Sequence, residues 1–152
     1  MTTIRGKRSA EPDLSGLAAR LRLVITRTAR RLRQQAGTDL GPSQTSALAS
    51  IERHGPLTPS ELARIERIQR PTATRIVARL EDAALVERVA DPTDGRSFTV
   101  AINADGLALM NKLRTRKNAY LARRMRELDA EDLATLDRAA EILEDLLEGE
   151  RR

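Results

Sequence analysis

Apolar residues recur every three or four positions along most of the chain, a spacing that predicts amphipathic helices. The first stripe predicts a helix over residues 14–36, which Gly37 would end. That stripe consists of Leu14, Leu17, Leu21, Val24, Thr28 and Leu32. Five further helices are expected: from 42–43 to about 54–55, from 58–60, from 69–70 to about 83–84, from 103–104, and from 129–130. The last one spaces its leucines and alanines like a coiled-coil seam.

A second pattern, with apolar residues at alternate positions, predicts two short strands over residues 85–89 and 97–102. Pro92 and Gly95 lie between the strands and favour a turn. The expected fold is therefore mainly α with a small β-hairpin. Arg96 gives the hairpin a basic tip.

The helix starts carry recognisable capping signals. Thr58 and Glu61 have the spacing of a capping box, and Pro59 occupies the first helical position between them. Asn103 and Asp129 are candidate caps for the last two helices. These signals place the start of the short helix that follows residue 58 with some precision.

The order of elements is helix, helix, arginine-rich helix and hairpin, which is the order of a winged helix-turn-helix domain. Such a domain places one helix in the major groove of DNA. We expect it over residues 37–103, with the hairpin as its wing. Long helices over 14–36 and 104–149 flank it as a dimerisation region, and residues 1–13 form a flexible basic tail.

The flanking helices are long for so small a domain, so their apolar stripes predict that two chains interleave as a homodimer. The alternative is that these helices pack only on their own domain. A two-fold dimer would hold two recognition helices about 34 Å apart, which matches a palindromic site.

Charge is distributed unevenly along the chain. The formal net charge of +5 favours a polyanionic partner only weakly. Residues 1–36 and 107–126 are strongly basic, whereas 127–150 are acidic apart from Arg138. This segregation predicts that basic and acidic helices lie against each other, within one chain or between two.

The fourth helix carries the candidate DNA-reading residues. With the apolar residues from Ala73 to Leu80 turned inward, Thr72, Arg75 and Arg79 form a neighbouring polar stripe, and Gln69 and Arg70 stand at the start of the helix. Arginine can bind guanine through two hydrogen bonds, and glutamine can bind adenine similarly. The alternative is an arginine-rich face that contacts only water. The residues expected to contact DNA are Thr58, Ser60, Gln69, Arg70, Thr72, Thr74, Arg75, Arg79, Arg88, Asp94 and Arg96.

The wing has a separate expected role. Arg96 lies at or beside the hairpin tip, where a narrow minor groove attracts guanidinium groups. Asp94 would hold Arg96 in place rather than bind DNA itself. The alternative is a polar turn with no DNA contact.

At these residues the chain resembles the MarR-type transcriptional regulators. The resemblance runs from the first helix to Leu147, and is most specific over residues 74–81 (TRIVARLE), 84–88 (ALVER) and 91–97 (DPTDGRS). It implies a homodimeric winged-helix protein, usually a repressor, whose affinity for double-stranded DNA falls when a small molecule or oxidant acts. Ala84 departs from the family by replacing a glycine, so the turn there must avoid a left-handed backbone or strain it. Asn103 replaces a threonine cap.

The resemblance also implies an effector, and the amino-acid composition excludes some classes of effector. The absence of cysteine excludes thiol oxidation, and His54, the single histidine, argues against a histidine-rich zinc site. A small anionic or aromatic compound remains, bound between the long helices and the winged helix, although the protein could also lack a ligand. The candidate pocket residues are Arg20, Arg27, Arg116 and Tyr120, for which surface or interhelical salt bridges are the alternative.

Other functions are less compatible with the sequence. It has no cysteine, one histidine, and no phosphate-binding glycine loop or metal-ligand cluster, so we expect no cofactor and no enzyme activity. It also lacks a membrane-spanning apolar run and an apolar signal-peptide segment, which predicts a cytoplasmic protein. The alternative function is a winged-helix adaptor or antirepressor that binds another protein rather than a specific operator.

Overall fold

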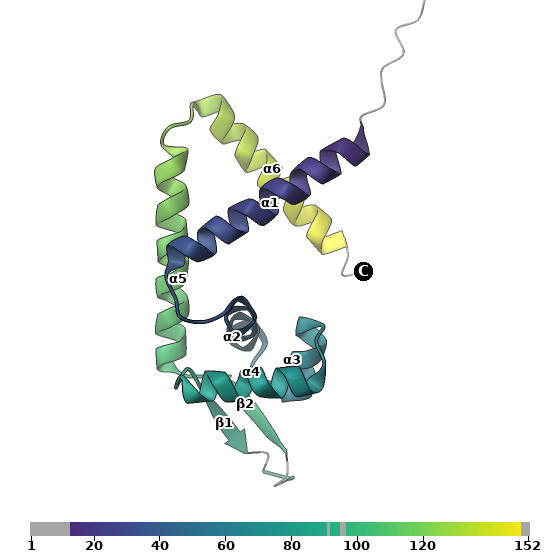
Figure 1. Ribbon diagram of the computed structural model, residues 1–152, viewed down its shortest axis with the longest axis vertical. Coiled ribbons are helices and arrows are strands. Elements are labelled where there is room, and N and C mark those ends of the chain that lie inside the picture. The colour runs from purple at the N-terminus through teal and green to yellow at the C-terminus, as the bar shows by residue number, and fades with distance from the viewer. Residues whose placement is uncertain (1–12, 91, 95–96, 150–152) are drawn as a thin grey trace, which may run out of the picture.

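The computed structural model describes residues 13–90, 92–94 and 97–149. Three long helices lie on one side of a compact lobe of shorter helices with a two-stranded hairpin (Figure 1). The elements are α1 (Leu14–Ala36), α2 (Pro42–His54), α3 (Pro59–Glu66), α4 (Arg70–Asp82), β1 (Val86–Ala90), β2 (Phe98–Ile102), α5 (Ala104–Met125) and α6 (Ala130–Gly149). The expected mainly α fold with a β-hairpin wing is confirmed.

Helix boundaries follow the capping signals. Gly37 ends α1 in a left-handed conformation, with φ at 59°. Thr58 and Glu61 form the reciprocal capping box of α3, since Thr58 Oγ1 accepts from the Glu61 amide and a Glu61 carboxylate oxygen accepts from the Thr58 amide. The side chains of Asn103 and Asp129 accept backbone hydrogen bonds at the starts of α5 and α6. The sequence therefore predicted the helix starts from local chemistry.

The hairpin is antiparallel, with Val86 opposite Ile102 and Ala90 opposite Phe98. Both strands begin one residue later than expected, and β1 also ends one residue later, at Ala90. An additional bridge joins Leu57 to Val100, so the segment between α2 and α3 extends the sheet by one residue pair. The wing is thus attached to the start of the helix-turn-helix.

The hydrophobic core lies in the lobe. Its fully buried side chains come from α2, α3, α4, β2 and α5: Leu48, Ile51, Leu62, Val77, Leu80, Val100 and Leu113. The inward face predicted for α4 is confirmed, because Ala73, Ile76, Val77 and Leu80 are all buried. This packing leaves the opposite side of α4 facing solvent.

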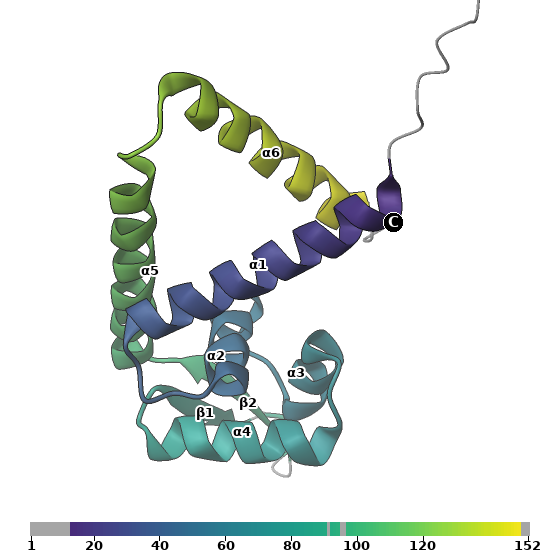
Figure 2. The same ribbon diagram turned by 45° about the horizontal axis from the view of Figure 1, so that its top comes forward.

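The long helices α1 and α6 are much less buried than the helices of the lobe. Along α1 only Ala36 is buried, and α6 has no buried residue. In Figure 2, α1, α5 and α6 form a triangle above the lobe, with α1 packed on α5. Among the described residues, no helix combines the length and apolar character needed to cross a membrane.

Candidate nucleic-acid interface

The helix pair α3–α4 presents its second helix at the surface. Arg67 ends α3 in a left-handed conformation, with φ at 53°, and the Ile68 amide donates to the Ala63 carbonyl across the turn at 2.9 Å. Gln69 then caps α4 with an extended backbone, and a proline lies in the first turn. The sharp turn allows α4 to bury one face while exposing the other.

A hollow of about 420 Å³ lies between the start of α3, the start of α4 and the wing. We call it the wing hollow, and its lining residues are Thr58, Pro59, Ser60, Arg70, Thr74, Asp94, Ser97 and Phe98. The structure thus gathers five of the residues predicted to contact DNA around one concave surface. These residues come from three separate segments of the chain.

A second hollow, of about 250 Å³, lies between α2 and α4. We call it the α2 hollow, and its lining residues are Ser43, Thr72, Arg75, Ile76 and Arg79. It contains the predicted polar stripe of α4. Ser43 is an addition, because nothing in the sequence indicates that the start of α2 lies beside α4.

The arginines of this surface are not neutralised. Within the described part of the chain, Arg70, Arg75 and Arg79 are exposed and form no ion pair. Arg75 Nη2 donates to Thr72 Oγ1 at 3.5 Å, and Thr74 Oγ1 donates to the Arg70 carbonyl at 3.0 Å. Arg75 and Arg79 lie on the side of α4 that faces the α2 hollow, whereas Arg70 lies at the start of α4 beside the wing hollow. Together these exposed guanidinium groups give a positively charged surface suited to phosphates and guanine edges.

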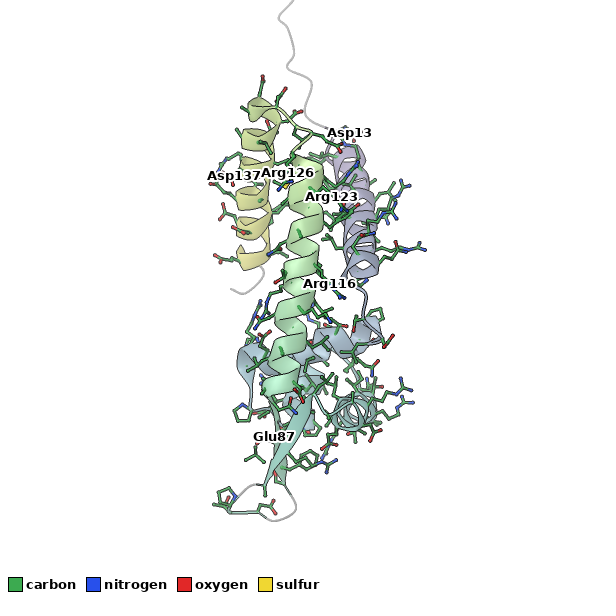
Figure 3. The ribbon with its side chains drawn as sticks, turned by 90° about the vertical axis from the view of Figure 1, so that its left-hand side faces the viewer. Asp13, Glu87, Arg116, Arg123, Arg126 and Asp137 are labelled. Carbon is green, nitrogen blue, oxygen red and sulfur yellow. The ribbon has the colours of Figure 1, made fainter. Side chains whose placement is uncertain are left out.

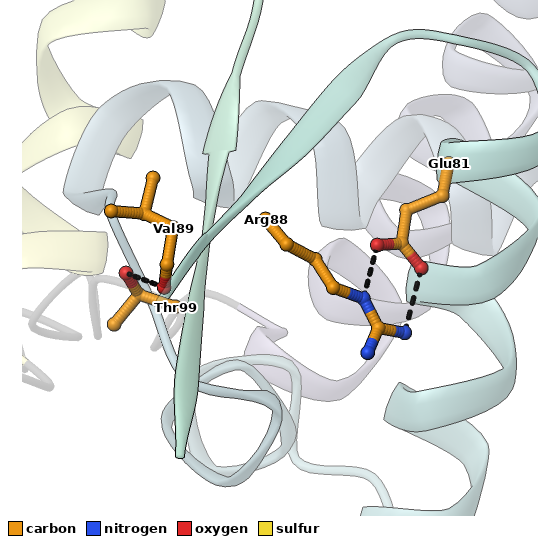
Figure 4. Close-up of polar contacts among 4 residues, drawn as sticks. All are labelled: Glu81, Arg88, Val89 and Thr99. Atoms are coloured by element: carbon orange, nitrogen blue, oxygen red, sulfur yellow. Dashed lines mark hydrogen bonds and ion pairs between the residues drawn. The ribbon is translucent and has the colours of Figure 1, made fainter. Parts of the chain in front are cut away.

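Arg88 is held differently from the arginines of α4. Its guanidinium forms a two-point ion pair with Glu81 at the end of α4, in which Nη2 lies 2.9 Å from Oε2 (Figure 4). It also stacks over the Phe98 ring, 4.1 Å from the centroid, and the hydrogen bond to Glu81 raises the pKa of Arg88. Arg88 therefore ties the wing to α4, and its contact with DNA stays a prediction.

The tip of the wing is only partly described. Asp94 is exposed, and its carbonyl accepts from the Ser97 amide at 2.9 Å. Arg96 lies outside the described residues, and so does the expected contact between Asp94 and Arg96. The insertion of Arg96 into a minor groove stays a prediction.

The four residues expected in an effector pocket line neither the wing hollow nor the α2 hollow. Arg116 Nη1 donates to the Ala36 carbonyl at 2.8 Å and to the Gly37 carbonyl at 3.1 Å, so it caps the end of α1 (Figure 3). Arg20 and Arg27 are exposed on α1, and Tyr120 lies beside Arg123. The N-terminal part of α1 extends away from the lobe (Figure 1).

A hollow of about 220 Å³ does exist where α1, α2 and α5 meet. We call it the α1 hollow, and its lining residues are Arg30, Arg33, Gln34, Ala36, Thr38, Leu40, Pro42, Thr45, Leu113 and Lys117. None of the four predicted residues lines it. The effector site and its four residues stay a prediction.

Comparisons with known proteins agree with this geometry. Residues 38–97, which include α2, α3, α4 and the wing up to the start of β2, match the model of the MarR family. The multiple antibiotic resistance protein MarR of Salmonella typhimurium is 30% identical over 100 residues, which cover 65% of this chain and 69% of that protein. The chain belongs to the MarR family.

Two further similar proteins match a larger share of this chain. An uncharacterised HTH-type transcriptional regulator of Mycobacterium leprae is 33% identical over 133 residues, 87% of this chain and 93% of its own. A crystal structure described as that of a transcriptional regulator from Pseudomonas aeruginosa superposes with a TM-score of 0.81 at 32% identity, covering 90% of this chain and 97% of the other. The protein is a MarR-family winged-helix transcriptional regulator and not an enzyme.

Proposed function

We propose that this regulator is a homodimeric repressor that binds a palindromic operator and is released by a small anionic or aromatic effector. The proposal is carried by Arg70, Arg75 and Arg79 of α4, which are exposed and form no ion pair with any residue that the structure describes. An arginine-rich helix face on a protein surface often contacts only water and contributes only to solubility. Here Arg70 borders the wing hollow, whereas Arg75 and Arg79 border the α2 hollow. The exposed helix beside a wing is the arrangement of a winged helix-turn-helix that reads the major groove.

The residues divide into two expected roles. Thr58, Ser60 and Arg70 surround the wing hollow and are suited to phosphate oxygens, which position a protein on DNA without reading its sequence. Arg75 and Arg79 extend from the middle of α4 and are suited to base edges. At the wing, Asp94 borders the same hollow, and the sequence predicts a further contact from Arg96.

The exposed apolar faces of the long helices support the homodimer. Leu14 of α1 is 71% exposed, and Leu146 and Leu147 of α6 are each 64% exposed. A folded monomer rarely leaves so extended an apolar surface in water. A second copy provides the matching surface, because basic α1 and acidic α6 attract each other between chains as well as within one.

The α1 hollow supports an effector of limited size and negative charge. It is mainly apolar in its walls, with Arg30, Arg33 and Lys117 among its lining residues. Its volume is below the range of about 300–1,000 Å³ typical of drug-sized ligands, which favours a small aromatic acid. Such a ligand would lie between the helix that joins the two copies and the lobe that binds DNA.

The decisive experiment is fluorescence anisotropy with a labelled duplex from upstream of the protein's own gene, compared with a scrambled duplex at two salt concentrations. Tight binding of the native duplex alone, retained at the higher salt, is the expected result. Equal binding of both duplexes that collapses with salt would reflect only phosphate attraction. That outcome would contradict an operator at this site and favour the protein-adaptor function.

A further inference from the structure

Helix α5 connects the DNA-binding lobe to the long helices. Only its first half is buried against the lobe, through Gly106, Met110 and Leu113. The second half leaves the lobe and continues toward α6 (Figure 3). The angle at which α5 leaves the lobe therefore sets where the lobe lies relative to the rest of the molecule.

The N-terminal end of α5 is held tightly enough to act as a pivot. Asn103 Nδ2 donates to the Ala84 carbonyl at 2.8 Å, and the Asn103 amide donates to the Leu85 carbonyl at 3.2 Å. A Cβ atom on Gly106 would lie 2.2 Å from the same Leu85 carbonyl oxygen, which is too close for any side chain. Here the helix meets the lobe backbone to backbone.

A second attachment lies about two turns further along the helix. Arg114 Nη1 lies 2.8 Å from Glu52 Oε2, and Arg114 Nη2 lies 2.7 Å from Glu52 Oε1. Arg114 Nη2 also donates to Asn111 Oδ1 at 2.8 Å. We call this group the α2–α5 brace, and it adjoins Leu113, the last buried residue of α5.

The α2–α5 brace is better suited to fixing the orientation of α5 relative to α2 than to stabilising the fold. The Arg114 side chain is 48% exposed, and exposed ion pairs contribute at most about 1 kcal/mol to folding. A two-point guanidinium–carboxylate pair, however, fixes the relative direction of both groups as well as their distance. Within the described residues, this is the ion pair that links α5 to the lobe.

The length of α5 makes a small angle important. Its 22 residues span about 33 Å at ~1.5 Å per residue. A tilt of roughly 6° about the pivot moves the far end by about 3.4 Å, which is the rise of one base pair. A brace that suppresses tilts of this size would discriminate half-site spacings that differ by one base pair.

We propose that the Glu52–Arg114 pair, acting between α2 and α5, sets the spacing of operator half-sites that the protein accepts. Arg114 is a positioning residue, since it contacts Glu52 and not DNA. This inference rests on the proposed homodimer, because spacing has meaning only for two lobes. It adds a determinant of specificity outside the DNA-contacting surface.

The first test measures lobe spacing without DNA. The chain has no cysteine, so Asp82→Cys at the exposed end of α4 provides one attachment site for a nitroxide label. Double electron–electron resonance then reports the distance between the two labels of a dimer. Glu52→Gln and Arg114→Gln should each widen the distance distribution by about 3 Å or more, the displacement given by the tilt above.

The second test measures spacing preference on DNA. Operators with the native spacing and with one base pair added or removed are compared by anisotropy. Both variants should reduce the preference for native spacing about threefold, the change expected from losing an exposed ion pair. Their charge effects on overall affinity are opposite, so a shared loss of spacing preference cannot arise from net charge.

Two controls isolate the brace. Arg124→Gln removes the same charge from the same helix but from a weaker pair, with Glu127 at 3.6 Å, and should keep the wild-type spacing profile. The double variant Glu52→Arg with Arg114→Glu reverses the ion pair and should restore the spacing preference that the single variants lose. Unchanged distances and profiles in both single variants would overturn the inference while leaving the proposed repressor intact. A wild-type chain that stays monomeric would overturn both.

Discussion

Ala84 has a left-handed backbone, with φ at 56°, at the turn between α4 and β1. The sequence left two possibilities at this position, a turn that avoids this conformation or one that strains it, and the structure has the second. The Ala84 amide and carbonyl are both used, in hydrogen bonds to Glu81 and Asn103. The turn is therefore held in place by its neighbours in spite of the Cβ atom.

Replacing Ala84 by glycine should stabilise the protein by about 0.5–1 kcal/mol. The left-handed conformation costs an ordinary residue about 1–2 kcal/mol, and part of the gain is lost because glycine loosens the unfolded chain. Urea unfolding monitored by circular dichroism measures the change. Ala83→Gly is the matched control, since Ala83 has φ at −79° and should only lose stability. Equal destabilisation by both substitutions would contradict strain at Ala84.

Arg75 tests the DNA-reading face. Arg75→Ala should weaken operator binding by about 1–3 kcal/mol and relax the preference at one base position, if its guanidinium contacts a base edge. Anisotropy titrations against the operator and single-base variants measure both effects. Arg53→Ala removes the same charge from an exposed position outside both hollows and should have a smaller, sequence-independent effect. Unchanged operator binding by Arg75→Ala would remove this residue from the interface.

At the scale of elements, the cap of α3 should make stability depend on pH. Hydrogen bonds from the Thr58 amide and hydroxyl lower the pKa of Glu61 below its ordinary value. A lowered carboxyl pKa stabilises the fold above the unfolded pKa, and this contribution disappears as pH falls through the folded pKa. α3 should therefore lose its charged cap in the acidic range below about pH 4.5.

Glu61→Gln provides the measurement. The substitution removes the charge but keeps an oxygen that can accept from Thr58, so it should lower the free energy of unfolding more at pH 7 than at pH 3. Urea titrations of both proteins at the two pH values give the difference. If the loss were the same at both pH values, the carboxylate charge would have no role in the cap.

The elements also show what the sequence could predict. Caps, glycine stops and apolar spacing are local, so they placed the helix starts and the buried face of α4 correctly. Contacts between segments far apart in the sequence could not be predicted from such local signals. Ser43 joins the α2 hollow, and Ser46 and Ser50 both donate to Glu66 across α2 and α3, because the folded lobe brings those helices together. The Glu52–Arg114 pair joins residues 62 positions apart, and no periodicity indicates it.

The candidate site was predictable to a similar extent. The polar stripe of α4 followed from which residues turn inward, and the structure places it in one hollow. The effector pocket stays a prediction. Arg116, one of its four residues, donates to the carbonyls at the end of α1, a long-range contact that the sequence did not indicate.

At the scale of the whole molecule, the apolar face of α6 should control assembly. Leu136 is 47% exposed, and α6 has no buried residue in the chain. Leu136→Asp should raise the dissociation constant of the dimer by about tenfold or more, since it exchanges a leucine worth about 1.5–3 kcal/mol on burial for a charge. Sedimentation velocity over a concentration series measures the monomer fraction.

Ala134→Asp is the matched control. It adds the same charge to α6 at an exposed position outside the stripe of Leu133, Leu136, Leu143 and Leu147. This variant should remain dimeric at concentrations where Leu136→Asp dissociates. Equal dissociation of the two variants would indicate that charge alone, rather than the leucine face, weakens the dimer. A wild-type protein that sediments as a monomer throughout would contradict the proposed assembly.

The uncovered face of α6 also has a genetic consequence. If pairing depends on α1, α5 and α6, a chain that has lost its α4 arginines still pairs normally with an intact chain. In a cell that makes equal amounts of both, only about a quarter of the pairs would have two functional reading helices. Alleles damaged in α4 should therefore be dominant over the wild type, whereas alleles that unfold the long helices should be recessive.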